Sequence, residues 1–272
     1  MAGDLSVEAI YNQWVASIPS DAPPRDREKK PERLRAVFKC RGDAVNLLYE
    51  RMQEPSAADW AWLLDALVDT DALAPGWSPW TVPPRIRVAA MAIANVSPLP
   101  PEMFSLLVRA AVYDLDLSGP RFFIDPCSRV FGTARTTNAI VGYLDHGTDF
   151  EKAGAASALY HAFFRFIDPS PIESEETLGT ASRRAIVALL RAFLQNEDIH
   201  VVRAAIRTLG LFRPGECSGE LRDLADQVIA VGSEHADEYT RWCIRSWAGA
   251  WTADGPEYPP RPRPEGAGSG AR

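Results

Sequence analysis

Residues 182–212 constrain the fold of this chain most, because they contain two consecutive segments with the hydrophobic period of an α-helix. In the second segment apolar residues recur at i, i+3, i+4 and i+7 and polar residues gather on the other side; the apolar set is Ile199, Val202, Ala205, Ile206 and Leu209. The connection at 196–198 is short, which predicts antiparallel helices. We therefore expect a helix pair whose apolar faces need neighbouring helices to cover them.

Local signals place the ends of these two helices. Asp198 can cap the free backbone amides at the start of the second helix, and Gly210 followed by Pro214 marks its end. The first helix is expected over 182–195, with Ile186, Leu189, Leu190 and Phe193 on its buried side.

Similar patterns recur around Ile86, Phe150 and Tyr239, and strand-like alternation is absent from the sequence. The predicted class is therefore all-α, with about ten to twelve helices on ordinary helix lengths. A chain of stacked helix pairs usually presents a surface rather than a chemical centre.

The pair at 182–212 resembles a HEAT repeat, in which a first helix, a short acidic turn and a second helix form one unit. The matching residues are the turn at 196–201 and, in the second helix, Arg203, Ala204, Ala205, Leu209 and Gly210; weaker likenesses lie at 86–90, 145–159 and 239–251. Asn196 stands where the family often has Asp, and Val202 where it often has Arg. The resemblance implies an α-solenoid of antiparallel HEAT-like helix pairs, but it does not select one activity.

The remaining segments follow from the same signals. Helices are expected at 4–18, 34–52, 86–96, 102–116, 127–144, 149–167, 219–231 and 236–251, together with a helix opened by a capping box at 56–59. Irregular segments are expected at 69–84 and 117–126, and an acidic loop at 168–179. We predict one HEAT-like domain over residues 1–251 and a disordered Pro- and Gly-rich tail over 252–272.

Composition limits the environment and the partners. The chain has 272 residues, 46% of them hydrophobic, which is ample for a buried core. Its four cysteines form no close pair, so neither a disulfide framework nor a zinc site is indicated. The acidic N-terminus and the lack of a long apolar run favour a cytoplasmic protein without membrane contact. A formal net charge of −7 argues against a nucleic-acid partner.

The sequence shows no familiar catalytic pattern. None of its four histidines lies in HExxH spacing, no Gly-rich phosphate loop follows a strand-like segment, and no GxSxG elbow occurs. We therefore predict no catalytic residue, no metal ligand and no cofactor, and an enzyme is less favoured than a binding protein.

Four arginines are the first candidate partner-binding group. If the second helices of neighbouring pairs stack in register, Arg203, Arg207, Arg241 and Arg245 form a basic strip on an otherwise acidic chain, suited to a protein with an acidic surface. Ion pairing along the helix surface, for example Asp237 with Arg241 at i, i+4, is the alternative interpretation.

Two further sets are candidates. His161 and Arg165 recur with Ser157 at i, i+4 and i+8 and could line a ligand-facing groove, although a partly exposed surface histidine fits equally. Trp77 and Trp80, in the Pro-rich segment, are candidate interface anchors or the residues that hold that loop on its own scaffold.

Three functions stay open at this point. The first is a noncatalytic protein-binding scaffold or adaptor. The second, implied by the resemblance, is an enzyme on a HEAT scaffold, similar to glycosylases for alkylated DNA bases or to bilin lyases. The third is an immunity protein that neutralises a toxin. The partner's identity, the oligomeric state and the pathway do not follow from the sequence.

Overall fold

The computed structural model of the chain describes residues 5–17, 44, 46–68, 84–94, 96–114, 118–167, 173–212 and 219–249. The regular structure is helical, with twelve helices and no strand in this part of the chain, which confirms the predicted all-α class and number of helices. Contacts divide the chain into two compact units, Met1–Gly132 and Thr133–Arg272. One domain over 1–251 stays a prediction, and the tail at 252–272 lies outside the described residues.

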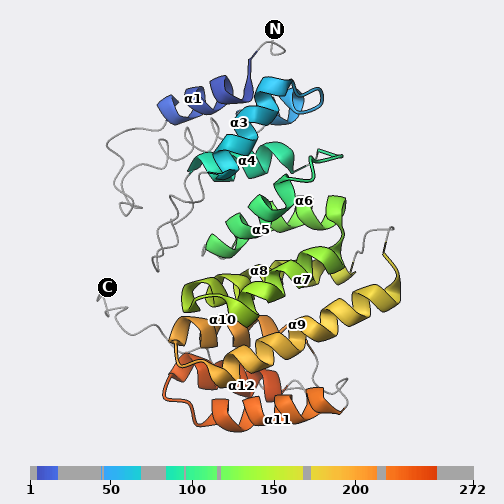
Figure 1. The fold of residues 1–272 in the computed structure, drawn as a ribbon. Helices are drawn as coiled ribbons and strands as arrows, with labels where there is room; N and C mark the ends of the chain where they lie inside the picture. Colours follow the sequence, from blue (N-terminus) through green and yellow to red (C-terminus); the bar gives the residue numbers. More distant parts are fainter. Residues whose placement is uncertain are drawn as a thin grey trace, which may run out of the picture. The chain divides into compact units, whose positions relative to one another are not determined.

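The first unit contains α1 (Val7–Ser17), helical residues 46–51, α3 (Ala57–Val68), α4 (Pro84–Ile93), α5 (Met103–Tyr113) and α6 (Arg121–Phe131). α3 packs against α1, α4 and α5, and α6 packs against α4 and α5 (Figure 1). Leu63, Ile86 and Phe123 are completely buried in the core of this unit.

The capping box predicted at 56–59 is present, and Asp59 also joins three segments of the first unit. The Asp59 amide donates to Ser56 Oγ at 3.3 Å, and the Ser56 amide donates to Asp59 Oδ2 at 2.8 Å. Asp59 also accepts from the Val7 amide at 2.9 Å and from Arg51 Nε at 2.8 Å. Burial alone would raise the pKa of Asp59, but the hydrogen bonds from Arg51, Ser56 and Val7 outweigh it and lower the pKa to about 2.

The irregular insertion expected at 117–126 is wrong over most of its length, because α6 begins at Arg121. Pro126 lies inside this helix and lacks the amide that would bond to the preceding turn. Complete burial of Phe123, Ile124 and Cys127 offsets that loss. The single helix expected at 127–144 is divided at Gly132, whose φ of 97° is readily adopted only by glycine.

The acidic loop expected at 168–179 is also wrong at its C-terminal end, because α9 already begins at Glu175. Ser174 caps this helix by accepting from the Thr177 amide at 3.2 Å. Glu175 and Glu176 occupy the first turn, where acidic side chains are favoured by the helix dipole. The preceding Glu173 accepts from the Thr133 and Ala134 amides at 2.6 and 2.7 Å, and so caps α7.

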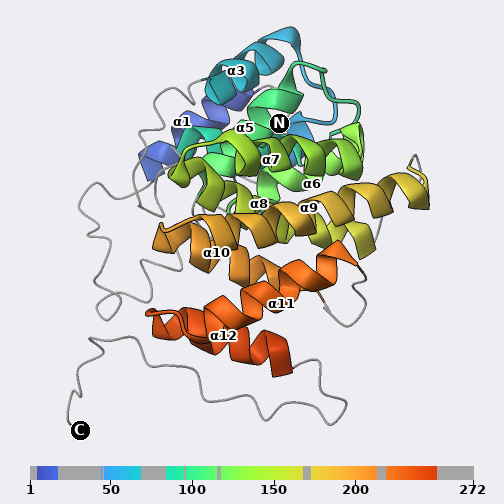
Figure 2. The same cartoon turned by 60° about the horizontal axis from the view of Figure 1, so that its bottom comes forward.

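The second unit consists of three antiparallel helix pairs: α7 (Thr133–His146) with α8 (Asp149–Ile167), α9 (Glu175–Gln195) with α10 (Ile199–Leu209), and α11 (Glu220–Ser233) with α12 (Glu238–Gly249). The first helices contact one another in the order α7, α9, α11, and the second helices in the order α8, α10, α12. Figures 1 and 2 show α9 beside α10 and α11 beside α12. Solenoid packing over the whole chain stays a prediction.

α10 lies at the centre of this unit and has the ends that its sequence predicts. Asp198 caps it by accepting from the His200 and Val201 amides at 2.8 and 3.3 Å, and Gly210 follows its last residue. Its buried face includes Val202, Ala205, Ile206 and Leu209, as expected, whereas Ile199 is only half-buried. Because α8, α9 and α12 all contact α10, burial extends further, to Val201, Ala204 and Thr208.

Polar contacts link neighbouring pairs at their turns. Asn196, in the turn before α10, donates from Nδ2 to Asp149 Oδ1 at 3.3 Å, at the start of α8. Thr208 Oγ1 of α10 donates to the Ala156 carbonyl of α8 at 2.7 Å, and this bond is buried. Asn196 therefore makes a contact between pairs although it departs from the residue that is common in HEAT repeats.

Candidate functional site

Several of the predicted site residues lie close together on α8, α10 and α12, the second helices of the pairs in the second unit. We define the second-helix face as eight exposed or half-buried residues: Ser157, Tyr160, His161 and Phe164 of α8, Arg203 and Arg207 of α10, and Tyr239 and Trp242 of α12. On α8 they follow one stripe at i, i+3, i+4 and i+7.

Aromatic rings make up much of the second-helix face. The Tyr160 ring lies edge-on to His161 and to Phe164, with centroids 5.4 and 5.3 Å apart. Tyr239 and Trp242 stack at 6.0 Å. The sequence analysis did not include Tyr160, Phe164, Tyr239 or Trp242 among the candidate site residues. The i, i+3 and i+7 positions relative to Ser157 are the signal that would have found the two residues on α8.

Arg203 is exposed but engaged in the fold. Its guanidinium makes two bonds to the Asp237 carboxylate, one of them from Nε at 3.1 Å and the other from Nη2. Asp237 in turn accepts from the amide and hydroxyl of Thr240, both at 2.8 Å, at the start of α12. Hydrogen bonds from Arg203 and Thr240 hold the pKa of Asp237 well below its usual range, against the effect of burial. Arg203 therefore fastens α10 to α12.

Arg207 lies one helical turn further along α10 and has a different environment. Its Nη2 donates to Ser157 Oγ of α8 at 2.8 Å, and no carboxylate of the described residues pairs with it. Burial lowers the pKa of the Arg207 guanidinium, and weaker electrostatic interactions with Tyr239, Tyr160 and Cys243 oppose that effect.

The other two arginines, Arg241 and Arg245, do not continue the basic strip that the sequence predicted. Arg241 donates from Nη1 to the carbonyls of His235 and Ala236, the latter at 2.8 Å, and so holds the turn between α11 and α12. The suggested Asp237–Arg241 pair is replaced by the Arg203–Asp237 pair. Arg245 is exposed on α12 and makes no ion pair or hydrogen bond with the described part of the chain.

The remaining predicted residues divide into two groups. His161 is half-buried on α8 beside Tyr160, four residues from Ser157. The Arg165 backbone lies in α8, whereas its side chain, together with Trp77 and Trp80, lies outside the described residues.

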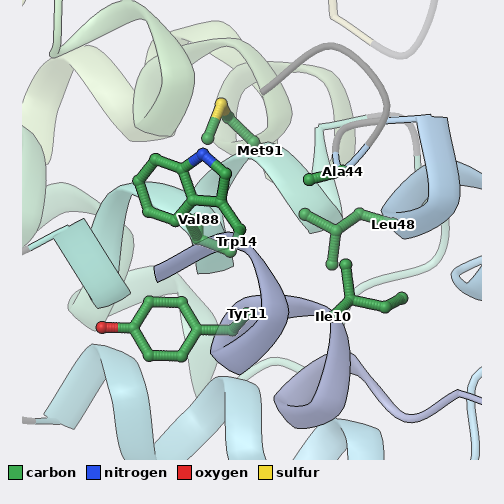
Figure 3. Close-up of a pocket in the computed structure, with 7 residues that line it drawn as sticks. All are labelled: Ile10, Tyr11, Trp14, Ala44, Leu48, Val88 and Met91. Carbon is green, nitrogen blue, oxygen red and sulfur yellow. The ribbon is translucent and has the colours of Figure 1, made fainter. Parts of the chain in front are cut away.

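The first unit has a small, partly open pocket, shown in Figure 3 with its lining residues Ile10, Tyr11, Trp14, Ala44, Leu48, Val88 and Met91. Its volume of about 10 Å³ is close to that of a single water probe, so it is too small for an organic ligand. A wider groove of the same unit is lined by Met52, Gln53, Pro55, Trp60 and residues 96–101. None of the described residues that line this groove has an acidic, basic or histidine side chain that would bind a charged group.

The described residues contain neither a candidate membrane-spanning helix nor a candidate metal site. No helix there is long and apolar enough to cross a membrane. No group of three or more His, Cys, Asp or Glu side chains is placed to hold a metal ion in the same ranges. The chain matches no protein-family model, no curated protein and no solved structure.

Proposed function

We propose that this protein recognises a segment of another protein, without catalysing a reaction, through the second-helix face. The HEAT-like scaffold role and the cytoplasmic location expected from the sequence belong to the same proposal. One observation carries it: a half-buried arginine with no carboxylate partner among the described residues lies within an aromatic surface.

The composition of the second-helix face supports recognition of protein. Arg, Tyr and Trp are the residue types most enriched in interface centres and among the residues that dominate binding energy. Phe164 adds a large ring that is 47% exposed to solvent. Such a ring gains free energy when a partner covers it.

Charge favours an acidic segment. α10 contains no acidic residue, and neither do residues 153–164 of α8. Because Asp237 neutralises Arg203, the local positive charge of this face is that of Arg207, on a chain whose formal net charge is −7. A partner with negative charge is attracted to this face more than to the rest of the surface.

Phe164 gives the cleanest test. Substitution of Arg203 would also break its bonds to Asp237, so a loss of binding would not separate recognition from folding. Phe164 is exposed, and Phe164→Ser leaves the buried core unchanged. Val231 of α11 is 53% exposed and belongs to the layer of first helices, so Val231→Ser is the matched control.

The experiment selects peptides from a random display library on the full-length protein and measures their affinity for both variants. We expect selected peptides to be enriched in Asp and Glu, to bind Phe164→Ser about tenfold more weakly, a loss of about 1.4 kcal/mol, and to bind Val231→Ser unchanged. Peptides that bind both variants as tightly as the parent protein would contradict the proposal.

A further inference from the structure

We propose that Arg207 is the specific anchor of the second-helix face and binds one carboxylate group of the partner segment. The inference rests on the proposed function for its partner, but it concerns a defined chemical group and a single side chain. It distinguishes Arg207 from the other arginines that the sequence suggested.

The first argument is the unused hydrogen-bonding capacity of Arg207. A guanidinium carries five N–H donors in a planar fork that fits a carboxylate with two parallel bonds. The described residues accept one hydrogen bond from Arg207, at Ser157 Oγ. Ser157 is itself held in place, because its hydroxyl donates to the Ala153 carbonyl at 3.0 Å. The fork is therefore oriented by α8 and retains donors for a ligand.

The charge of Arg207 is partly shielded from water. Burial lowers the pKa of Arg207, which means that water stabilises its charge less than it would stabilise an exposed guanidinium. An ion pair made with a partly desolvated cation is stronger than one made in open water. Arg203, by contrast, is already neutralised by Asp237.

The position of Arg207 in α10 favours a carboxylate over a phosphate as its ligand. Arg207 lies in the last turn of α10, where the helix dipole contributes about half a negative charge. One guanidinium in that position suits a ligand with a single negative charge. A phosphate ester carries a charge of about −1.5 to −2 at neutral pH and is usually held by several cations or by amides at a helix N-terminus.

The neighbouring rings define what should accompany the carboxylate. Tyr160 and Tyr239 lie near Arg207, on the two helices that flank α10. A flat apolar group next to the carboxylate would pack against these rings. Benzoate is therefore a suitable small probe, and benzamide and phenyl phosphate are its neutral and dianionic counterparts.

The test titrates each probe into the full-length protein and follows side-chain NMR signals of the arginines and tryptophans. We expect benzoate to bind with a Kd on the order of 1 mM, as its few heavy atoms allow, and to bind at least tenfold more tightly than benzamide or phenyl phosphate. Arg207→Met should weaken benzoate binding at least tenfold. Arg183→Gln, a control at an exposed arginine of α9, should leave it unchanged.

Each other result overturns the inference. Equal binding of benzoate and benzamide would show that charge is not recognised, and tighter binding of phenyl phosphate would indicate a dianion site. Unchanged benzoate binding in Arg207→Met would place the anion elsewhere. The proposed function can fail separately. If selected peptides bound Arg207→Met as tightly as the parent protein, Arg207 would not be the anchor, but peptide recognition by the second-helix face would stand. If benzoate bound and no peptide did, the carboxylate site would stand and the proposed function would be contradicted.

Discussion

Arg207→Met should make the protein more stable, because no carboxylate in the described part of the chain compensates the charge of Arg207. Methionine keeps much of the length and the apolar character of the arginine stem, so the contacts of the stem are largely retained. The guanidinium, which burial separates from water, is removed. Sites that trade stability for binding are expected to respond in this way.

The magnitude follows from two opposing terms. The substitution removes one charge-assisted hydrogen bond, from Arg207 to Ser157, but Ser157 keeps its bond to the Ala153 carbonyl and is not left unsatisfied. Replacing buried ionic groups by apolar ones of similar size ranges from neutral to about 1–4 kcal/mol stabilising. Because Arg207 is only half-buried, we expect the low end, about 1 kcal/mol.

Arg203→Met, one helical turn away, should have the opposite sign. It leaves the Asp237 carboxylate, whose side chain is 15% exposed, without its guanidinium partner and weakens the start of α12. Exposed ion pairs contribute up to about 1 kcal/mol and breaking buried ones costs about 3–5 kcal/mol, so this partly buried pair should cost about 2 kcal/mol.

Urea denaturation followed by circular dichroism, with hydrogen exchange of the α12 amides to assign the effect to the second unit, measures both changes. The sign difference is the decisive result, since both substitutions remove one arginine from the same helix. If Arg207→Met destabilised the protein by as much as Arg203→Met, Arg207 would be a structural residue, and the argument for an uncompensated charge would be refuted.

Four further predictions concern the fold. The pKa of Asp59 in the folded protein is about 2, below its ordinary value of 3.8, so the ionised carboxylate stabilises the first unit above about pH 4. This contribution to the free energy of unfolding falls by about 2 kcal/mol as the pH falls toward 2. Denaturation at pH 3 and at pH 7 should show that Asp59→Asn removes this acid dependence and lowers stability at pH 7. A Cβ at Gly232 would lie 2.4 Å from Cγ1 of the buried Ile244 and 3.1 Å from Phe193 Cζ, so Gly232→Ala should cost about 1–3 kcal/mol in urea denaturation. Gly179→Ala, which meets no atom within 4 Å, should instead stabilise α9 by about 0.5–1 kcal/mol. Glu173→Ala should speed hydrogen exchange in the first turn of α7 and lower the free energy of unfolding by about 1 kcal/mol, because the amides of Thr133 and Ala134 lose their acceptor. Unchanged exchange of these amides would contradict the capping role of Glu173.

The elements that sequence reasoning placed well are those whose signals are local. α8 has its expected bounds, and the ends of α10 follow from Asp198 and Gly210. The capping box at 56–59 was found because its residues bond within one turn. Such features depend on spacing along the chain, which the sequence displays directly.

The errors arose where one signal was given too much weight. The Gly119-Pro120 turn signal before α6 suggested irregular structure, yet burial of Phe123 and Ile124 stabilises a helix there. The acidic residues before α9 suggested a loop, although Ser174 followed by two glutamates is also a helix-start signal. Tertiary packing outweighed the local turn signal at α6, and helix capping and electrostatics determined the start of α9.

The candidate site shows a different limit, because helix periodicity places Arg203 and Arg207 on the same face but says nothing about which of them has a partner. That depends on the register of α10 against α8 and α12. Packing sets this register: the buried Thr208 bonds to Ala156 on one side, and Arg203 lies over the Tyr239 ring at 5.7 Å on the other. In this register Asp237 reaches Arg203, and Arg207 faces a hydroxyl instead of a carboxylate. A one-residue change in register would alter these pairings, so the distinction between a structural arginine and a binding arginine becomes visible only when the helices are packed.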